Sequence, residues 1–192
     1  AVVTAWDGRS KALDVTGRAP PPMLYTLGGR APVRCVCVLP GSQRIVTGDN
    51  TGQMHVWRAG AGLGGAGDEV GGILLCTVTA HRSSVCSGVA AGAGVIATVG
   101  WDRALRIWWL SPSDVLNMRW QLMEAHSMEL TCVAMSAKGL VATGCMQGQV
   151  KVWKPDGHLY SPEPAYSWDK QAWVTAAAWS PGTQDWPLLL AT

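Results

Sequence analysis

The side chains best suited to chemistry lie in one stretch, residues 81–108, where His81 is followed by Thr98, Asp102 and Trp108. An imidazole beside a carboxylate can act in general acid–base catalysis, and histidine is also a common metal ligand. Whether these residues perform chemistry depends on whether the same spacing occurs elsewhere in the chain.

The same spacing occurs in two other stretches. In all three, 17 residues separate the first anchor from a threonine, and 10 more separate that threonine from a tryptophan. The further sets are Arg30, Thr47, Thr51 and Trp57, and His126, Thr143, Gln147 and Trp153. A period of about 40–50 residues indicates a repeat architecture. A position fixed by a repeat favours a structural role over catalysis. His55, outside these anchors, has no partner that spacing identifies.

Each repeat consists of short apolar or alternating runs separated by Gly, Pro and Asp turns, which predicts strands. In the first full repeat we expect strands at 33–38, 44–48, 53–57 and 73–79. We expect a flexible loop at 59–72, further strands at 118–124 and 139–144, and one that begins at Trp173. Four short strands per repeat predict an all-β propeller in which each repeat forms one radial blade.

These repeats resemble the WD40 family, whose repeat contains a Gly-His pair, a Ser or Thr, a turn Asp and a Trp-Asp ending. In that family the His, Ser/Thr, Asp and Trp form a hydrogen-bonded tetrad inside a blade. The resemblance implies one complete tetrad and two partial ones. The complete set is His81, Thr98, Asp102 and Trp108; the partial sets are His126, Thr143 and Trp153, and Thr47 and Trp57. Gln147 and Thr51 depart from the pattern at the Asp position, as does Arg30 at the His position.

We therefore predict that residues 1–192 are part of a single WD40 β-propeller with three full blades and two partial ones. The expected blades are 1–28 (partial), 33–79, 85–124, 130–168 and 173–192 (partial). Propellers of this family usually have about seven or eight blades, so we expect the remaining blades to belong to the same longer polypeptide. The alternative is a four-bladed ring closed by pairing the two partial blades.

Composition excludes several classes of function. The 15 basic and 13 acidic side chains nearly balance, so nothing favours nucleic acid or an anionic membrane as a partner. Residues 83–101 carry no charge, but their glycines and the charges in the matching stretches argue against a membrane span. The six cysteines form no C-x-x-C pair, which predicts no metal site and favours reduced thiols in the cytoplasm.

An enzyme is not expected. Propeller enzymes usually place reactive groups at the central channel, which the innermost strands line. Those strands are VRCVCV, VCSGVAA, LTCVAMS and VTAAAW, and Arg34 is their single charged residue. A catalytic dyad has no carboxylate or imidazole to draw on there. We expect no catalytic residues and no cofactor.

Binding of other proteins is the expected function. In the family, the residue just before the turn Asp position opens on the face most often used for partners. The four equivalents are Trp6, Asn50, Trp101 and Met146, with Arg30 and Arg82 near the same rim. Exposed Trp and Met suit a protein-binding hot spot. We expect a scaffold in a multi-subunit complex, with a cytoskeletal or ciliary setting as the family-level expectation. The alternative is a phospho-peptide or nucleic-acid reader that uses the basic rim.

Overall fold

The computed structural model describes residues 2–6, 9–13, 23–28, 31–58, 72–82, 86–92, 94–156, 159–160, 166–169, 172–179 and 189–191. These residues form strands and turns without a helix, so the predicted all-β class is confirmed. Within those ranges, no helix is long and apolar enough to cross a membrane.

Three antiparallel sheets have four strands each, joined in chain order from the innermost strand outward. The first contains β4 (Val33–Val38), β5 (Arg44–Asp49), β6 (Gln53–Arg58) and β7 (Ile73–Thr79). The second contains β8 (Cys86–Gly92), β9 (Val95–Gly100), β10 (Leu105–Leu110) and β11 (Leu116–Leu122). The third contains β12 (Leu130–Met135), β13 (Val141–Cys145), β14 (Gln149–Trp153) and β17 (Tyr166–Asp169).

Smaller sheets lie on either side of these three. Before them, β1 (Val2–Trp6), β2 (Arg9–Leu13) and β3 (Met23–Gly28) form a three-stranded sheet. After them, β18 (Ala177–Trp179) pairs with β19 (Leu189–Ala191). A short hairpin of β15 (Pro155–Asp156) and β16 (Leu159–Tyr160) lies between β14 and β17 in the chain.

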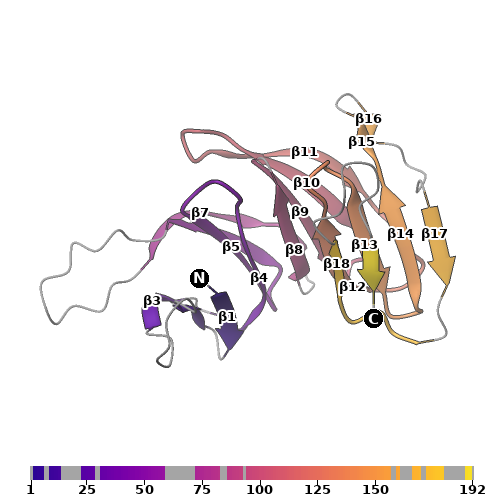
Figure 1. Ribbon diagram of the computed structural model, residues 1–192, viewed down its shortest axis with the longest axis horizontal. Helices are drawn as coiled ribbons and strands as arrows, with labels where there is room; N and C mark the ends of the chain where they lie inside the picture. Colours follow the sequence, from indigo (N-terminus) through magenta and orange to yellow (C-terminus); the bar gives the residue numbers. More distant parts are fainter. Residues whose placement is uncertain are drawn as a thin grey trace, which may run out of the picture.

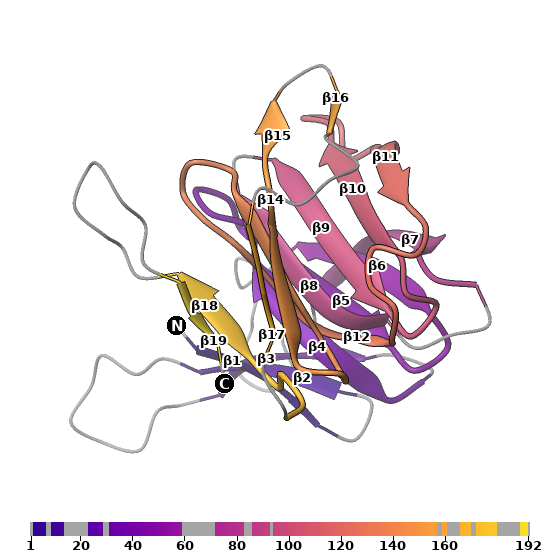
Figure 2. The same cartoon turned by 90° about the vertical axis from the view of Figure 1, so that its right-hand side faces the viewer.

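The sheets stand side by side and are turned relative to one another, so that their innermost strands meet (Figure 1). β4 lies beside β8, β8 beside β12, and β12 beside β18. Figure 2 shows β8, β9, β10 and β11 of the middle sheet in order across the view. This is the arrangement of propeller blades around an axis.

Apolar side chains fill both spaces beside the middle sheet. Alternate residues of β9 point to opposite faces: Ile96 packs towards the first sheet, whereas Ala97 and Val99 pack towards the third. β9 is therefore buried on both faces, which explains why its sequence is apolar apart from Thr98. Trp108 of β10 packs in the apolar layer between the first and second sheets, and Trp153 of β14 packs in the layer between the second and third.

Neighbouring innermost strands approach so closely that they exclude side chains at some positions. A Cβ added to Gly88 would lie 2.9 Å from Val99 Cγ2 and 3.1 Å from the backbone nitrogen of Val133. Hydroxyl groups also join these strands. Ser87 Oγ donates to the Leu130 carbonyl at 2.5 Å, and Thr131 Oγ1 donates to that of Val174. Ser87 and Thr131 occupy equivalent β-bulges.

Several strand boundaries differ from those expected. β11 begins and ends two residues before 118–124, and β13 begins at Val141 instead of 139. β18 begins at Ala177, not Trp173, because the preceding segment bonds to the third sheet: Val174 N donates to the Cys145 carbonyl. The expected loop at 59–72 lies outside the described residues except for its last member.

Substitution of Gly144 tests the close approach of β12, β13 and the segment before β18. A Cβ there would lie 2.5 Å from Val174 Cγ1 and 2.8 Å from Cys132 Sγ. We expect Gly144→Ala to lower the free energy of unfolding by about 1–3 kcal/mol, measured by denaturant unfolding. Gly92→Ala is the matched control, because its Cβ would meet the flexible Met135 side chain at 3.2 Å. Equal losses in the two variants would contradict this packing.

Candidate functional site

The middle sheet brings His81, Thr98, Asp102 and Trp108 together. Trp108 Nε1 donates to Thr98 Oγ1 at 3.0 Å, and Thr98 Oγ1 lies 3.1 Å from His81 Nε2. His81 Nδ1 lies 2.8 Å from Asp102 Oδ1. Because a carboxylate only accepts, Nδ1 carries the proton and Nε2 accepts from the threonine. His81 and Thr98 are fully buried, so this chain satisfies polar groups that water cannot reach.

Arg106 balances the charge of this cluster. Its Nη1 donates to Asp102 Oδ2 at 2.7 Å. Burial raises the pKa of Asp102, but bonds and charge from His81 and Arg106 outweigh burial and bring that pKa to about 2. Burial lowers the pKa of His81, and Arg106 lowers it further against the opposing effect of Asp102. Asp102 is thus ionised and His81 neutral at neutral pH, which suits a structural brace rather than a proton-transfer pair.

The third sheet forms only part of the same cluster. His126 Nε2 lies 2.8 Å from Thr143 Oγ1, which accepts from Trp153 Nε1 at 2.9 Å. Gln147 stands at the position of Asp102 but faces outward and accepts from Ser127 Oγ at 2.6 Å. His126 Nδ1 is buried, and no described group meets it in hydrogen-bonding geometry, although Gln149 is near enough to raise the pKa of the ring. Burial and the nearby charge of Lys151 lower the pKa of His126 to about 3.

The first sheet uses an acidic residue that sequence reasoning missed. Trp57 Nε1 donates to Thr47 Oγ1 at 2.9 Å, as the pattern implied. Asp49, rather than a residue at position 51, supplies the carboxylate: it accepts from Thr51 N at 2.8 Å and from Gln53 N at 3.0 Å. His55 Nε2 lies 3.2 Å from Asp49 Oδ2.

The structure therefore corrects the expectation that His55 has no partner, and it adds an acidic residue, Asp49, that the repeat pattern did not identify. His55 has partners on both ring nitrogens, Asp49 and Thr77 Oγ1, the latter at 2.9 Å from Nδ1. Burial raises the pKa of Asp49, but hydrogen bonds from Thr51, Gln53 and His55 leave it below its usual value. The missed signal was an acidic residue at the end of β5, two positions before the one the repeat predicted.

A basic residue lies directly opposite each threonine on the neighbouring strand, which sequence reasoning also missed. The pairs are Thr4 with Lys11, Thr47 with His55, Thr98 with Arg106, and Thr143 with Lys151. In the three full sheets this residue precedes the tryptophan by two positions, in HVW, RIW and KVW. That spacing was the available signal.

The expected partner-binding residues occupy equivalent turns where the structure describes them. Asn50 lies between β5 and β6, Trp101 between β9 and β10, and Met146 between β13 and β14. Asn50 N bonds to the Pro32 carbonyl and Met146 N to that of Glu129, so each turn is tied to the segment entering its own sheet. These turns therefore lie at one edge of the sheets.

The exposure of the predicted rim residues varies. Trp101 is 43% exposed, Arg82 and Asn50 are exposed, and Met146 is half-buried. Trp6 ends β1, but its side chain lies outside the described residues, as does all of Arg30. The expectation of an exposed Met146 is thus only partly met, because its backbone bond draws it against the β11–β12 connection.

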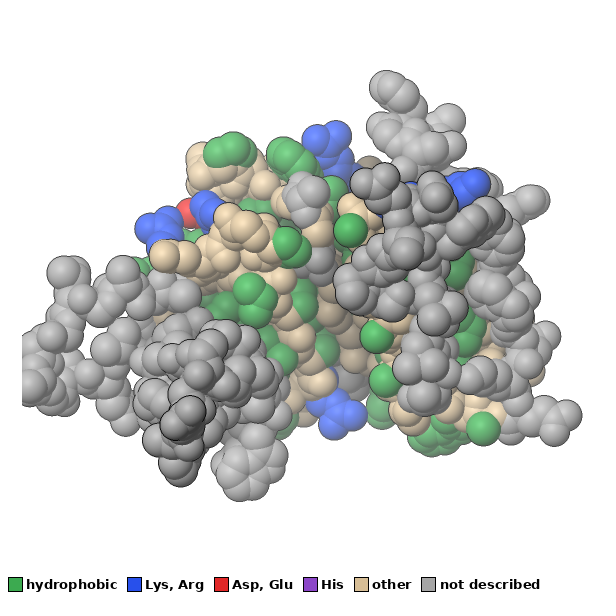
Figure 3. Space-filling view, in the orientation of Figure 1, with side chains coloured by type: hydrophobic (Ala, Val, Ile, Leu, Met, Phe, Trp, Pro, Cys, Tyr) green, Lys and Arg blue, Asp and Glu red, His purple; other side chains and the backbone are tan. Residues whose placement is uncertain are grey.

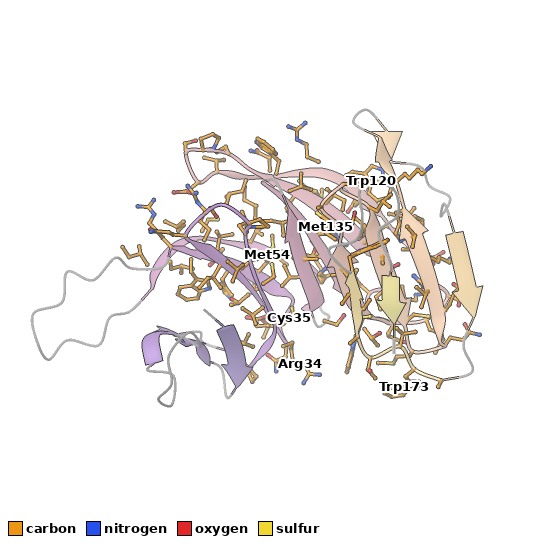
Figure 4. The ribbon with its side chains drawn as sticks, viewed as in Figure 1. Arg34, Cys35, Met54, Trp120, Met135 and Trp173 are labelled. Carbon is orange, nitrogen blue, oxygen red and sulfur yellow. The ribbon has the colours of Figure 1, made fainter. Side chains whose placement is uncertain are left out.

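Two exposed apolar side chains at this edge were not singled out from the sequence. Met128, in the β11–β12 connection, is 42% exposed, and Trp173, before β18, is 64% exposed. Trp173 was missed because it was assigned to a strand. Figure 4 shows Trp173 and Arg34 at the same lower edge of the view, both directed outward.

The described side chains offer no metal centre, since no three His, Cys, Asp or Glu residues among them gather to hold an ion. Cys35, Cys37, Cys76, Cys132 and Cys145 form no disulfide. Burial raises the pKa of Cys37 far above its ordinary range, with Cys35 adding to the effect, and burial also raises that of Cys132. Such thiols are poor nucleophiles.

Acid should weaken the Asp102 cluster. The folded-state pKa of about 2 lies below the unfolded value of about 3.9, so this stabilisation is complete above about pH 4 and is lost towards pH 2. We expect Asp102→Asn to lower the free energy of unfolding at neutral pH. We also expect a shallower decline of that free energy from pH 4 to 2 than in the parent chain, measured by urea unfolding. Parallel pH profiles would contradict the ionised Asp102.

Gln147→Asp should repair the incomplete cluster of the third sheet. An aspartate at this position can accept from His126 Nδ1, as Asp102 does from His81. We expect the free energy of unfolding to rise by about 0.5–1.5 kcal/mol, with a higher His126 pKa in NMR titration. Gln147→Ala, which removes the Ser127 contact without adding an acceptor, should show neither gain. An unchanged His126 pKa in the Asp variant would show that the two side chains do not meet.

The comparison with known families agrees with this geometry. The family model described as WD domain, G-beta repeat matches residues 22–58 and 119–154. These matches run from β3 to β6 and from β11 to β14, so each includes a threonine–tryptophan pair. No curated protein matches the chain. The chain therefore contains WD40 repeats at residues 22–58 and 119–154, and its three four-stranded sheets share one pattern.

Proposed function

We propose that this chain is a non-catalytic scaffold that binds protein partners within a larger assembly, through the edge that carries Trp101 and Trp173. WD40 repeats generally serve as protein-interaction scaffolds. The observation that carries the proposal for this chain is the exposure of large apolar side chains at the turns and connections of successive sheets.

The chemistry of this edge supports a protein partner. Trp101 and Trp173 expose large apolar side chains, and tryptophan is enriched in binding hot spots. Met128 adds a flexible apolar side chain that can adapt to the shape of a partner. Arg82 and Arg34 are exposed at the same edge and supply positive charge beside the apolar groups. Apolar anchors with polar neighbours are the usual composition of a protein interface.

The polar clusters support a role without catalysis. His81 is fully buried, and Asp102 is occupied by His81 and Arg106, so neither presents a free group to a substrate. The tryptophan–threonine hydrogen bond recurs in all three sheets, with a complete or partial set of polar partners around it, which fits a brace for each blade. Catalysis would require a reactive group in contact with substrate.

The setting that we propose is a reducing compartment, the cytoplasm, with cytoskeletal or ciliary assemblies as the context. Cysteines that form no disulfide support the reducing compartment. The cytoskeletal or ciliary context follows from the resemblance to the WD40 family.

The test compares partner capture by the full chain and by its Trp101→Ala/Trp173→Ala variant. We expect the double variant to lose at least about tenfold in affinity for partners captured by the parent chain, because truncation of two hot-spot residues removes about 2 kcal/mol or more. Quantitative affinity purification, followed by binding measurement with each recovered partner, gives the comparison.

The matched control is Val115→Ala/Met118→Ala, which removes two exposed apolar side chains near the outer strand β11. This variant should bind as the parent does. Equal binding by both double variants would remove the proposed edge from consideration. Loss of binding at high salt with no effect of the tryptophans would instead favour a phospho-peptide or nucleic-acid reader.

A further inference from the structure

Two arginines of the first sheet converge on one carboxylate of the second. Arg44 of β5 and Arg58 of β6 are directly opposite each other in the strand register. Arg44 Nε donates to Asp114 Oδ1 at 2.5 Å, and Arg58 Nη2 donates to Asp114 Oδ2 at 2.7 Å. Like charges at opposed positions repel, so Asp114 offsets a repulsion within the first sheet. At the upper left of Figure 3, acidic and basic side chains lie side by side.

This contact leaves positive charge in excess. Two guanidinium groups face a single carboxylate, and each uses one N–H group towards Asp114, although a guanidinium carries five. The hydrogen bond from Arg44, assisted by Arg58, lowers the pKa of Asp114. The Arg58 side chain is about half exposed, so it can turn towards a further anion.

Asp114 lies in a tight turn that also presents serine hydroxyls. The turn between β10 and β11 has the sequence Ser111-Pro112-Ser113-Asp114. Asp114 N bonds to the Ser111 carbonyl at 3.0 Å, and Ser111 Oγ accepts from Val115 N at 3.0 Å. Ser111 thus closes the turn. Ser113 is exposed, and its Oγ lies 2.9 Å from Ser111 Oγ.

The chemistry that fits this arrangement is a phosphate on Ser113. Phosphoserine carries a charge of about −1.5 to −2 at neutral pH and three acceptor oxygens, and arginine is the side chain best suited to bind it. Added to the single charge of Asp114, that charge would bring the anionic groups of the turn to about −2.5 to −3, against two guanidinium charges already aimed at the turn. The hydroxyl of Ser111 offers one more donor within reach of Ser113.

We propose that Ser113 is a phosphorylation site and that Arg44 and Arg58 of the neighbouring sheet receive its phosphate. A protein kinase supplies the γ-phosphoryl group of a nucleoside triphosphate. The bond from the γ-phosphorus to the leaving nucleoside diphosphate breaks, a new bond to Ser113 Oγ forms, and the hydroxyl proton passes to a base of the kinase. Modification then fastens the β10–β11 turn to the β5–β6 hairpin and so tightens the contact between the first two sheets.

The experiment uses the full chain with phosphoserine installed at position 113, in the parent background and in Arg44→Gln/Arg58→Gln. Both arginines are partly exposed, so the double substitution should leave the fold intact. In the parent background we expect the phosphate pKa, ordinarily about 6, to fall by about 0.5–1 unit in phosphorus NMR titration. We expect the thermal midpoint to rise by about 2–4 °C on phosphorylation. Neither change should occur in the double variant.

Two results would overturn the proposal. The first is a phosphate pKa and thermal midpoint that shift equally in both backgrounds, which would show that the arginines do not bind the phosphate. The second concerns a diffusible anion. Stabilisation of unmodified Ser113→Ala chain by millimolar inorganic phosphate, equal to that from phosphoserine, would assign the arginines to free phosphate and not to Ser113.

Discussion

The interaction on which each sheet depends is the hydrogen bond from a tryptophan indole to a threonine hydroxyl on the adjacent strand. It recurs at 2.9, 3.0 and 2.9 Å in the first, second and third sheets. A buried indole N–H without an acceptor would cost about 1–3 kcal/mol. A threonine can accept that proton and still donate its own, as Thr98 does to His81. The fixed interval from threonine to tryptophan follows from this requirement.

The group that accepts hydrogen bonds from the basic residue varies among the sheets. Each sheet has a basic residue opposite its threonine, and in each sheet a different acceptor binds that residue. Asp49 lies beside His55, and Asp102 binds Arg106. In the third sheet Lys151 Nζ instead donates to the Ala125 carbonyl at 2.8 Å. The common constraint is that a half-buried nitrogen donor needs an acceptor, and the position of the acid in the repeat is free to change.

These differences explain which features of the structure could be predicted from the sequence and which could not. The order of the strands and the threonine–tryptophan pairs depend on fixed intervals along the chain, so they could be predicted. The Asp49–His55 pair depends on cross-strand register and on an acid outside the expected position, so the intervals concealed it. The start of β18 and the burial of Met146 depend on contacts with the third sheet and the β11–β12 connection, which no local pattern encodes.

The buried polar clusters also fix the backbone at the edge of the sheets that carries Trp101. Asp102 Oδ1 accepts from Ala104 N at 3.2 Å, and Arg103 N bonds to the Gly100 carbonyl, so the turn that carries Trp101 is fixed from within. A side chain held on a fixed turn loses less conformational freedom on binding than one on a mobile loop, and this raises affinity for a given contact area. The polar cluster that first suggests catalysis therefore fixes the backbone beside an exposed tryptophan, on which the proposed recognition depends.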